Sequence, residues 1–472
     1  MKILLIWNEK TKDIEILSQE LERHSHKVIR RKLINGDKDK IPATALLGCV
    51  PVGDEEKFPP VGEDIIKELY KVESLVLTMI NRNYRYDKMG VDERRHLYYN
   101  ILRYWHGILK ENNPDMVIFQ FIPHMVFDYI IYELAKLLNI KTVMVWDSWV
   151  SDRMFIYTDF WQGSTYLQEE LRKNRGKTFS LKDLSPDLRD YYELQNDQKN
   201  DSTPVYIKEQ RIRKLRVQRS ISKRLKPIKQ SIKDLTIFKK IIFYFLKFPS
   251  GNLKKEYISL QVKPDFDKKF VYAPLNYQPE ATTSPLGDMF VDQILMLEIL
   301  SFSAPRDWII YVKEHPNQWD GRGLNYFSSR YSGYYKRISK LKNVCLIPIE
   351  ADTYKLINQA QAVAVVTGTA GWEAILRNKP AIIFGYPWYK DCQCILKVNN
   401  VKNCQEVFQK IVNGWRPNQQ EIVNYLYSLD KSTFHGYVEA AKNSKLTSTE
   451  SINNIVQAIL SEIKKFEINN IK

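Results

Sequence analysis

The sequence predicts an α/β protein made of two Rossmann-like, doubly wound domains that face a cleft. Short apolar runs rich in β-branched residues alternate with helical patterns in both halves of the chain. Several of these runs are apolar at every position, as in the buried strands of a parallel sheet. A charged segment without strand signals separates the two series, and 472 residues are enough for two or three domains.

Residues 1–175 form the first predicted domain. Asp115–Phe121 reads as a buried strand introduced by Pro114, and a helix and the strand Lys141–Trp146 complete a βαβ unit whose end delivers Asp147. The other elements predicted here are strand Lys2–Trp7, helix Ile14–His24, strand Lys27–Leu33, loop Pro42–Gly62 and helices Glu63–Ile80, Asp92–Glu111 and Asp128–Leu138.

Residues 176–262 form a predicted basic helical insertion. Tyr206–Lys255 contains 16 lysines and arginines against Glu209 and Asp234, so this segment carries nearly all of the net charge of +16. An apolar stripe with helical spacing, interrupted by Pro227, predicts an amphipathic helix; its members are Ile221, Leu225, Ile228, Ile232 and Leu235. The stripe either packs on the protein or lies on an anionic membrane surface.

The composition excludes several classes. The chain is 44% hydrophobic, which rules out disorder throughout, and outside the basic segment it is nearly neutral, so we expect no nucleic-acid partner. Five cysteines without a CxxC pair predict neither a metal site nor a disulfide framework. We find no signal peptide or membrane span, which predicts a cytoplasmic protein, peripheral at the inner face of the plasma membrane if the basic segment binds there.

Residues 263–455 form the second predicted domain, and 456–472 a helix end and tail. Its centre is Ala362–Tyr386, where strands Ala362–Val366 and Pro380–Phe384 flank the turn Thr367–Gly371 and helix Trp372–Arg377. The other elements predicted here are strand Phe270–Ala273, helix Asp288–Phe302, strands Trp308–Lys313 and Val344–Pro348, and helices Thr353–Asn358, Cys404–Val412, Gln420–Ser428 and Thr447–Phe466.

The turn Thr367–Gly371 (TGTAG) is a candidate anion site. It lies at the carboxyl end of a predicted strand, where open α/β sheets bind ligands, and the N–H groups of a helix start favour phosphate. The alternative is a glycine turn with a threonine N-cap and no ligand, because the turn matches neither a P-loop nor GxGxxG.

Two further strand ends carry residues suited to the same ligand. They are Asn276–Ala281 and Lys313–Pro316, and in a doubly wound sheet both would meet the TGTAG turn at one edge. Together they offer lysine and histidine to a phosphate and carboxylates to sugar hydroxyls, which an enzyme with a nucleotide leaving group needs. Each residue alone also has an ordinary structural interpretation.

In this order and spacing, three stretches resemble the bacterial capsule polysaccharide biosynthesis family, which includes retaining Kdo transferases of capsule and lipopolysaccharide assembly. They are YAPLNYQPEATTSP (272–285), WIIYVKEHPNQW (308–319) and VVTGTAGWEAILRNKPAIIFGYPWY (365–389). The resemblance covers about residues 265–395, and the first domain matches only in general layout. It implies a GT-B-like fold and a glycosyltransferase with a nucleotide-sugar co-substrate, typically CMP-linked, and no other cofactor or metal.

The resemblance also implies roles for individual residues. His315 would contact the donor phosphate, the TGTAG turn would bind the same phosphate, and Gln278 and Glu280 would line the cleft. The catalytic residues expected are Asp147, His315 and Glu280, and the donor-binding residues are Gln278, Lys313, Glu314, Pro316, Thr367, Gly368, Thr369, Ala370, Gly371 and Glu373.

Asp147 takes the place of the family's nucleophile. Retaining Kdo transferases have a nucleophilic aspartate just after a strand of the first domain, and Val145–Arg153 (VWDSWVSDR) is the matching segment, with Arg153 as an anion contact. This chain lacks the glycine that follows the family's aspartate and has Trp146 in place of its glutamate. The alternative is that Asp147 is a polar residue at the end of a strand, without a catalytic role.

The function expected is transfer of Kdo or a related acidic sugar from a CMP-linked donor to a surface polysaccharide or glycolipid. Two alternatives remain open. One is a UDP- or GDP-sugar transferase of the same fold, and the other is a non-catalytic scaffold of capsule assembly that binds polysaccharide or membrane.

Overall fold

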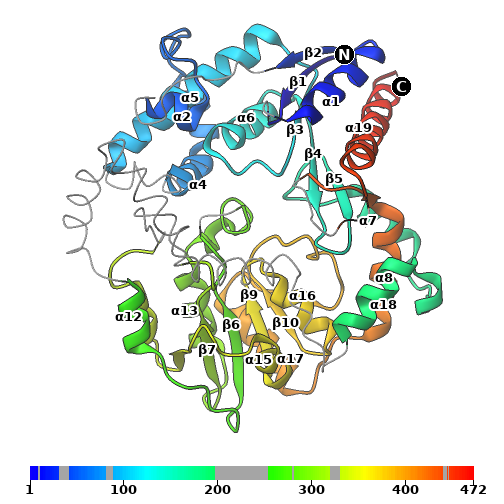
Figure 1. Ribbon diagram of the computed structural model, residues 1–472. Helices are drawn as coiled ribbons and strands as arrows, with labels where there is room; N and C mark the ends of the chain where they lie inside the picture. Colours follow the sequence, from blue (N-terminus) through cyan, green and yellow to red (C-terminus); the bar gives the residue numbers. More distant parts are fainter. Residues whose placement is uncertain are drawn as a thin grey trace, which may run out of the picture.

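Two six-stranded sheets organise the chain, one in each of two α/β domains (Figure 1). Helices cover both faces of each sheet, which confirms the predicted class of two Rossmann-like domains. The structure of the protein is a computed structural model, and it describes residues 1–8, 11–30, 42–80, 89–196, 253–278, 281–318, 330–438, 444 and 446–471.

The first sheet has the strand order β12-β5-β4-β3-β1-β2. Its four strands from β4 to β2 are parallel, whereas β5 runs antiparallel to β4 and β12 antiparallel to β5. Neither β5 nor β12 was expected from the sequence. The bounds are β1 (Lys2–Ile6), β2 (Lys27–Arg30), β3 (Met116–Phe119), β4 (Lys141–Asp147), β5 (Arg153–Tyr157) and β12 (Phe434–His435).

Alternating strand residues bury both faces of this sheet. Leu4 and Ile6 pack in the core shared with α5 and α6, and Ile3 and Leu5 pack in the core shared with α1. The expected strands and helices are therefore present, with an extra turn of helix in the predicted loop. The helices are α1 (Lys12–Arg23), α2 (Ala43–Gly48), α3 (Glu63–Glu68), α4 (Tyr70–Ile80), α5 (Val91–Asn112) and α6 (Val126–Leu137).

The C-terminal helix α19 (Ser448–Ile471) returns to the first domain and lies beside α1 and the N-terminus (Figure 1). Its apolar residues Ile452, Ile455 and Ile459 are buried in the same core as Ile3 and Leu5. The predicted boundary between residues 455 and 456 falls inside this helix. The last part of the chain thus completes the first domain, because one face of the first sheet needs an apolar cover.

The second sheet is parallel throughout, with the order β11-β10-β9-β6-β7-β8. Its strands are β6 (Phe270–Pro274), β7 (Ile309–Lys313), β8 (Val344–Leu346), β9 (Ala362–Val365), β10 (Ala381–Ile383) and β11 (Ile395–Lys397). Its helices are α12 (Leu253–Leu260), the short 3-10 helix η4 (Asp288–Val291), α13 (Gln293–Ser303), α14 (Tyr334–Ser339), α15 (Thr353–Gln359), α16 (Thr369–Leu376) and α17 (Val401–Val412).

The two domains are packed together along one side by α7, α8 and α18 (Figure 1). Aromatic side chains of both domains meet at this junction. Phe155 lies 6.3 Å from Trp388 between ring centroids, and Trp372 donates from Nε1 to the hydroxyl of Tyr191 at 3.0 Å. The helices are α7 (Thr165–Lys173), the 3-10 turn η2 (Leu181–Asp183), α8 (Pro186–Asn196) and α18 (Gln419–Ser432).

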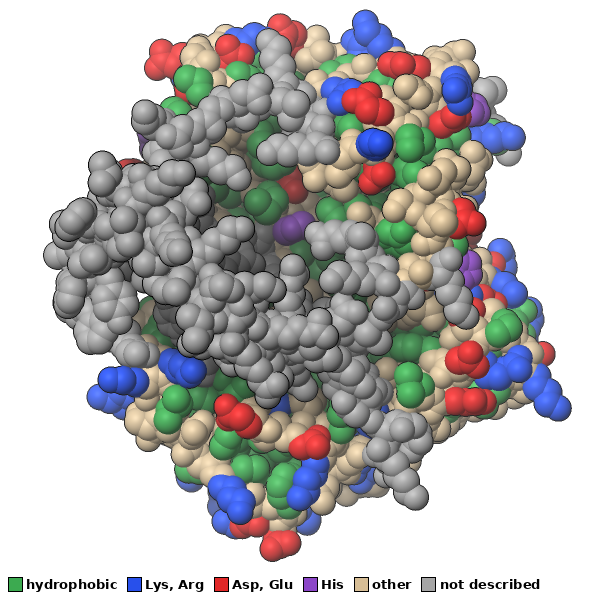
Figure 2. Space-filling model, viewed as in Figure 1, with side chains coloured by type: hydrophobic (Ala, Val, Ile, Leu, Met, Phe, Trp, Pro, Cys, Tyr) green, Lys and Arg blue, Asp and Glu red, His purple; other side chains and the backbone are tan. Residues whose placement is uncertain are grey.

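Most of the predicted basic segment lies outside the described residues, including its apolar stripe and Pro227. On the face shown in Figure 2, the described surface has lysine, arginine and acidic side chains mixed over both domains. This mixture agrees with the nearly neutral net charge of the chain outside the basic segment. Within the described ranges, every helix is too short or too polar to cross a membrane.

Candidate functional site

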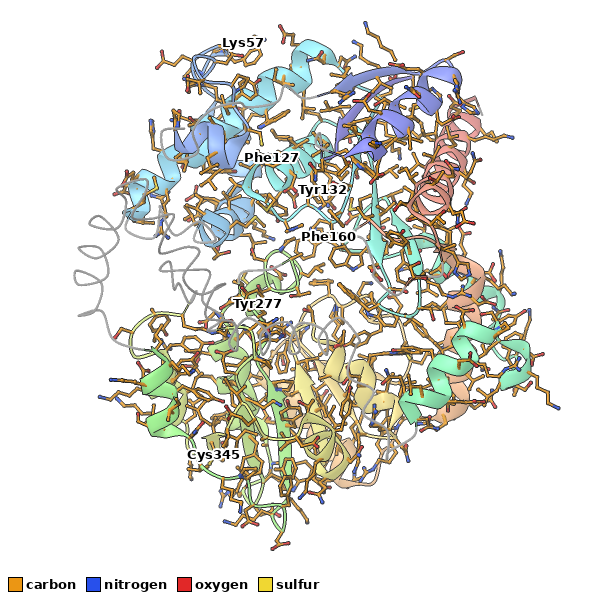
Figure 3. The ribbon with its side chains drawn as sticks, in the orientation of Figure 1. Lys57, Phe127, Tyr132, Phe160, Tyr277 and Cys345 are labelled. Carbon is orange, nitrogen blue, oxygen red and sulfur yellow. The ribbon has the colours of Figure 1, made fainter. Side chains whose placement is uncertain are left out.

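The three predicted strand ends lie side by side at the carboxyl edge of the second sheet. β6 pairs with β7 on one side and with β9 on the other, and the strand order reverses between β6 and β9. Such a reversal is where doubly wound sheets bind ligands. Tyr277, just beyond β6, lies on the side of the second domain that faces the first domain (Figure 3).

Helix α16 begins at this reversal. Gly368 is its N-cap, with an extended backbone (φ −65°, ψ 147°), and Thr369, its first residue, is exposed. The first N–H groups of a helix have no intrahelical acceptor, so this start offers donors and a positive dipole end to an anion. Ala370 is half-buried, while Gly371 is packed beneath the ring of Tyr389.

Asn276, the first residue of the predicted strand end Asn276–Ala281, is held beside the start of α16, although the sequence predicted no role for it by itself. Its backbone N–H donates to Gln293 Oε1 at 2.7 Å, and Gln293 Nε2 donates back to its carbonyl at 3.0 Å. Asn276 Nδ2 donates to Thr367 Oγ1 at 3.1 Å, and that hydroxyl in turn donates to the carbonyl of Thr282. The only proton of the Thr367 hydroxyl is thereby used, so the amide orientation of Asn276 is fixed.

This orientation leaves Asn276 Oδ1 as a buried acceptor without a partner among the described residues. Asn276 is 7% exposed, and its Oδ1 would lie 3.7 Å from a Cβ placed on Gly368. An unpaired buried carbonyl oxygen costs about 1–3 kcal/mol. A ligand that donates a hydroxyl or N–H here would remove that cost.

His315 follows β7, half-buried at the same edge. Its Nδ1 accepts from the N–H of Asn317 at 3.2 Å, which makes Nε2 the donor nitrogen of the neutral ring. The ring lies 5.4 Å from that of Tyr277 between centroids, so the β6 and β7 ends are in contact. Pro316 is exposed next to it.

Lys313 and Glu314 are built into the framework around this edge. Lys313 Nζ donates to the carbonyl of Ala351 at 2.9 Å and to Thr353 Oγ1, so it joins the end of β7 to the start of α15. Glu314 is fully buried and forms an ion pair with Arg330 at 3.0 Å. These contacts do not support direct donor binding by either residue, which stays a prediction.

Arg330 connects the β6 and β7 ends, and the sequence gave no signal for it. Its guanidinium donates twice to Glu314 (3.0 and 3.1 Å), once to Gln278 Oε1 and once to the carbonyl of Asn276 at 3.2 Å. Tyr335 adds a hydrogen bond to Glu314 at 2.6 Å. A single buried cation thus fixes the loop that carries Asn276 and Gln278.

Gln278 pairs with a second glutamine. Its N–H donates to Gln318 Oε1 at 3.1 Å, and Gln318 Nε2 donates to its carbonyl at 3.0 Å. Its own Nε2 donates to the carbonyl of Val291 at 2.7 Å. Glu280 lies outside the described residues.

Glu373 is buried one turn into α16, and burial raises the pKa of its carboxyl group. The charges of Arg377 and Lys313 and a hydrogen bond from Thr369 act in the opposite direction. The carboxyl group of Glu373 is thus buried, and its charge is partly stabilised by these contacts. Its role in donor binding stays a prediction.

Asp147 lies at the carboxyl end of β4, as predicted. Its Oδ1 accepts from the N–H of Trp149 at 2.6 Å, and burial raises the pKa of Asp147 to about 6. Trp149 has a positive φ of 57° and its side chain is 45% exposed. Asp147 forms no hydrogen bond or ion pair with any described residue of the second domain, so its place in the reaction remains a proposal.

Arg153 is a structural residue, and its predicted role as an anion contact is not supported. It is 2% exposed, and its guanidinium binds Asp187 at 2.8 and 3.0 Å and Asp430 at 2.8 Å. Ser185, Thr433 and the carbonyl of Asp430 accept its other hydrogen bonds. These partners lie at the start of α8 and at or just beyond the end of α18, so Arg153 joins β5 to the domain junction.

Solved structures with a similar course of chain include two parts of KpsC from Thermosulfurimonas dismutans. The beta Kdo 2,7 transferase is 12% identical, with 75% of this chain and 88% of that chain covered and a TM-score of 0.29. The beta Kdo 2,4 transferase is 15% identical, with 66% and 87% covered and a TM-score of 0.32. UDP-GlcNAc 2-epimerase from Neisseria meningitidis is 12% identical, with 98% and 100% covered and a TM-score of 0.24. These values carry no argument about activity.

No curated protein sequence matches the chain significantly. The sequence profile of the capsule polysaccharide biosynthesis protein family matches residues 286–393. This range runs from η4 through β7 and its His315 to α16 and β10, and it agrees with the stretch in which the resemblance was seen. Residues 286–393 are therefore similar to the capsule polysaccharide biosynthesis protein family.

Proposed function

We propose that the protein is a glycosyltransferase of capsule assembly that uses a nucleotide-activated sugar. The donor would be CMP-linked, with Kdo or a related acidic sugar, and the acceptor a polysaccharide or glycolipid. The family match supports the link to capsule synthesis, and it includes the start of α16 and His315. The nucleotide and sugar come from the resemblance of the strand-end motifs.

The observation that carries this proposal is the exposed start of α16 beside Asn276 Oδ1, which has no partner in the described part of the chain. The helix start favours a phosphate, whereas the amide oxygen requires a donor such as a hydroxyl. A nucleotide sugar has both groups a few bonds apart. A free inorganic anion would satisfy only the first of them.

The proposed chemistry is a double displacement. A carboxylate oxygen of Asp147 attacks the anomeric carbon, and the bond from that carbon to the phosphate oxygen breaks with its electron pair leaving on the nucleotide. His315 Nε2–H and the α16 N–H groups stabilise the departing phosphate. An acceptor hydroxyl then attacks the anomeric carbon, and the bond to Asp147 breaks with its electron pair returning to the carboxylate. The acceptor proton passes to solvent, and the two displacements give net retention.

A substitution at Thr369 tests the donor site. Proline is well tolerated at the first position of a helix, and the extended backbone of Gly368 suits a residue before proline. Thr369→Pro therefore keeps α16 but removes one N–H donor and fills the space in front of it. Thr369→Ala is the matched control, because both variants lose the hydroxyl that bonds to Glu373.

The measurement is thermal unfolding with CMP, UDP and GDP, followed by nucleotide release from their sugar adducts. A ligand at a hundred times its Kd adds about 2.7 kcal/mol of stability. We expect CMP to stabilise the wild type and Thr369→Ala but not Thr369→Pro. Stabilisation by UDP or GDP alone would indicate a UDP- or GDP-sugar donor instead. Nucleotide binding without release of nucleotide from any sugar adduct would favour a non-catalytic scaffold. No response to any nucleotide would contradict the proposal.

Membrane association through Tyr206–Lys255 is a separate part of the proposal. It rests on the charge of that segment, since its apolar stripe lies outside the described residues. Binding to vesicles with anionic lipid should fall when Lys223, Arg224, Lys226 and Lys229 are changed to Gln. Equal binding by this variant would show that the segment does not act as a membrane contact.

A further inference from the structure

A cavity of about 500 Å³ lies at the same sheet edge, one strand away from the predicted site. Its walls come from η4 and α13, from the end of β10, and from the end of β11 and the loop after it. The wall residues used below are Asp288, Phe290, Phe384, Tyr386, Lys397 and Asn399. This size is typical of small-molecule sites. The sequence had assigned none of these residues to a site.

Lys397 and Asp288 place opposite charges on this cavity without touching. Lys397 Nζ lies 4.5 Å from the ring centroid of Tyr386 and forms no hydrogen bond or ion pair with a described residue. Burial lowers the pKa of Lys397 and raises the pKa of Asp288, while each favours the charged form of the other. Asp288 is half-buried and Lys397 is exposed where it lines the cavity. Two opposite charges that are not paired with each other can bind a ligand with complementary groups.

Aromatic rings form the apolar part of the wall. Phe290 and Phe384 pack edge to face with 5.0 Å between centroids, and Tyr386 packs in the same way on Trp161 of the first domain, also at 5.0 Å. Tyr386 is thereby fixed in place. A ring beside a cation and an amide suits a sugar, which has apolar C–H faces as well as hydroxyls.

The cavity directly adjoins the proposed phosphate site. Gly385 lies between the wall residues Phe384 and Tyr386. Its N–H donates to the carbonyl of Val366 at 2.9 Å. A Cβ placed on Gly385 would lie 2.7 Å from Thr367 Cγ2. The turn that begins α16 and the wall of the cavity are thus in contact. This contact makes the cavity the adjacent space for a group attached to a phosphate bound at α16.

We propose that the cavity between η4, β10 and β11 binds the glycosyl group of the donor and selects a carboxylated monosaccharide. The sugar carboxylate pairs with Lys397, while Asp288 and Asn399 bind hydroxyls and Tyr386 packs against the ring. This assignment rests on the proposed function for its place in the reaction. The charge of the cavity, however, can be tested by itself.

Glucuronic acid and glucose are suitable probes, because they differ only in the carboxylate. Their binding to the full-length protein is measured by saturation-transfer NMR and calorimetry, next to CMP and CMP-N-acetylneuraminic acid. The variants are Lys397→Met, which removes the charge but keeps the length, and Asp288→Asn. The control is Lys410→Met, which changes an exposed lysine on α17.

We expect the wild type and Lys410→Met to bind glucuronic acid more tightly than glucose. Lys397→Met should weaken the binding of glucuronic acid at least tenfold. It should also remove the extra affinity of CMP-N-acetylneuraminic acid over CMP, while the affinity for CMP itself is unchanged. Asp288→Asn should weaken the binding of both glucuronic acid and glucose. Retained CMP binding by Lys397→Met also shows that this variant is folded.

The outcomes separate the two proposals. If CMP binds but Lys397→Met retains wild-type discrimination, or no carboxylated probe binds the wild type, the cavity assignment is wrong and the proposed function stands. If no nucleotide binds but glucuronic acid still depends on Lys397, the cavity is a carboxylated-sugar site and the proposed function is wrong.

Discussion

The hydroxyl of Tyr389 lies directly against Gly371, where it would be 2.6 Å from a Cβ on that residue. The same hydroxyl donates to the carbonyl of Gly368, the N-cap of α16. Gly371 is therefore required by packing, because its missing side chain makes room for the tyrosine that fixes the helix start. The glycine that looked like part of an anion-binding turn serves the site indirectly.

Gly371→Ala should destabilise the protein by about 1–3 kcal/mol, as overpacking does. The new methyl group also lies 3.0 Å from Val365 Cγ2, so the tyrosine is the neighbour that must move. Urea unfolding measures the cost. The double variant Gly371→Ala/Tyr389→Phe should lose less than the sum of the single variants, and simple additivity would contradict this account.

Asp147→Asn should abolish sugar transfer while nucleotide binding is retained. Asparagine still has an Oδ1 to accept from the N–H of Trp149, so the turn after β4 should stay intact. The exposed Asp190→Asn is the control. Wild-type turnover in Asp147→Asn would remove this residue from the mechanism.

The same variant has a predicted pH dependence of stability. Because burial raises the pKa of Asp147 from 3.8 to about 6, its stabilising protonated form is fully present below about pH 4 and is lost as the pH rises through 6. Asp147→Asn should therefore match the wild type in Tm at pH 4 and exceed it at pH 7. A Tm difference that does not vary with pH would contradict the buried-charge explanation.

Arg330→Met should cost about 3–5 kcal/mol of unfolding free energy, because it leaves the buried carboxylate of Glu314 unpaired. It should also weaken nucleotide binding, since Arg330 holds the carbonyl of Asn276. Adding Glu314→Gln should recover part of the stability, as the uncompensated charge is then gone. Urea unfolding of the single and double variants measures this, and a double variant less stable than Arg330→Met would refute it.

Arg153→Met should lower stability without changing nucleotide binding. Its loss leaves Asp187 and Asp430 without their shared partner at the junction of β5, α8 and α18. Thermal unfolding with and without CMP makes the comparison, with the exposed Arg172→Met as control. If Arg153→Met unfolds like the wild type but no longer binds CMP, Arg153 is an anion contact after all.

The alternation of strands and helices could be predicted from the sequence because it depends on local patterns. Runs such as Ala362–Val366 are apolar at every position and are buried on both faces of a parallel sheet. Parallel strands share a carboxyl edge, so the meeting of the β6, β7 and β9 ends followed from the fold class alone. The short strand β5 was missed, because Arg153–Tyr157 is distinguished mainly by its antiparallel pairing with β4.

The sequence by itself therefore determined the two-domain α/β class, the candidate anion site at α16 and the similarity of residues 286–393 to the capsule polysaccharide biosynthesis family. Only the tertiary structure decided which side chains are available to a ligand. Glu314 is paired with Arg330, sixteen residues away, and Lys313 with the start of α15. Asn276 Oδ1, in contrast, has no partner among the described residues. Such pairings depend on packing between distant segments, and no local pattern encodes them.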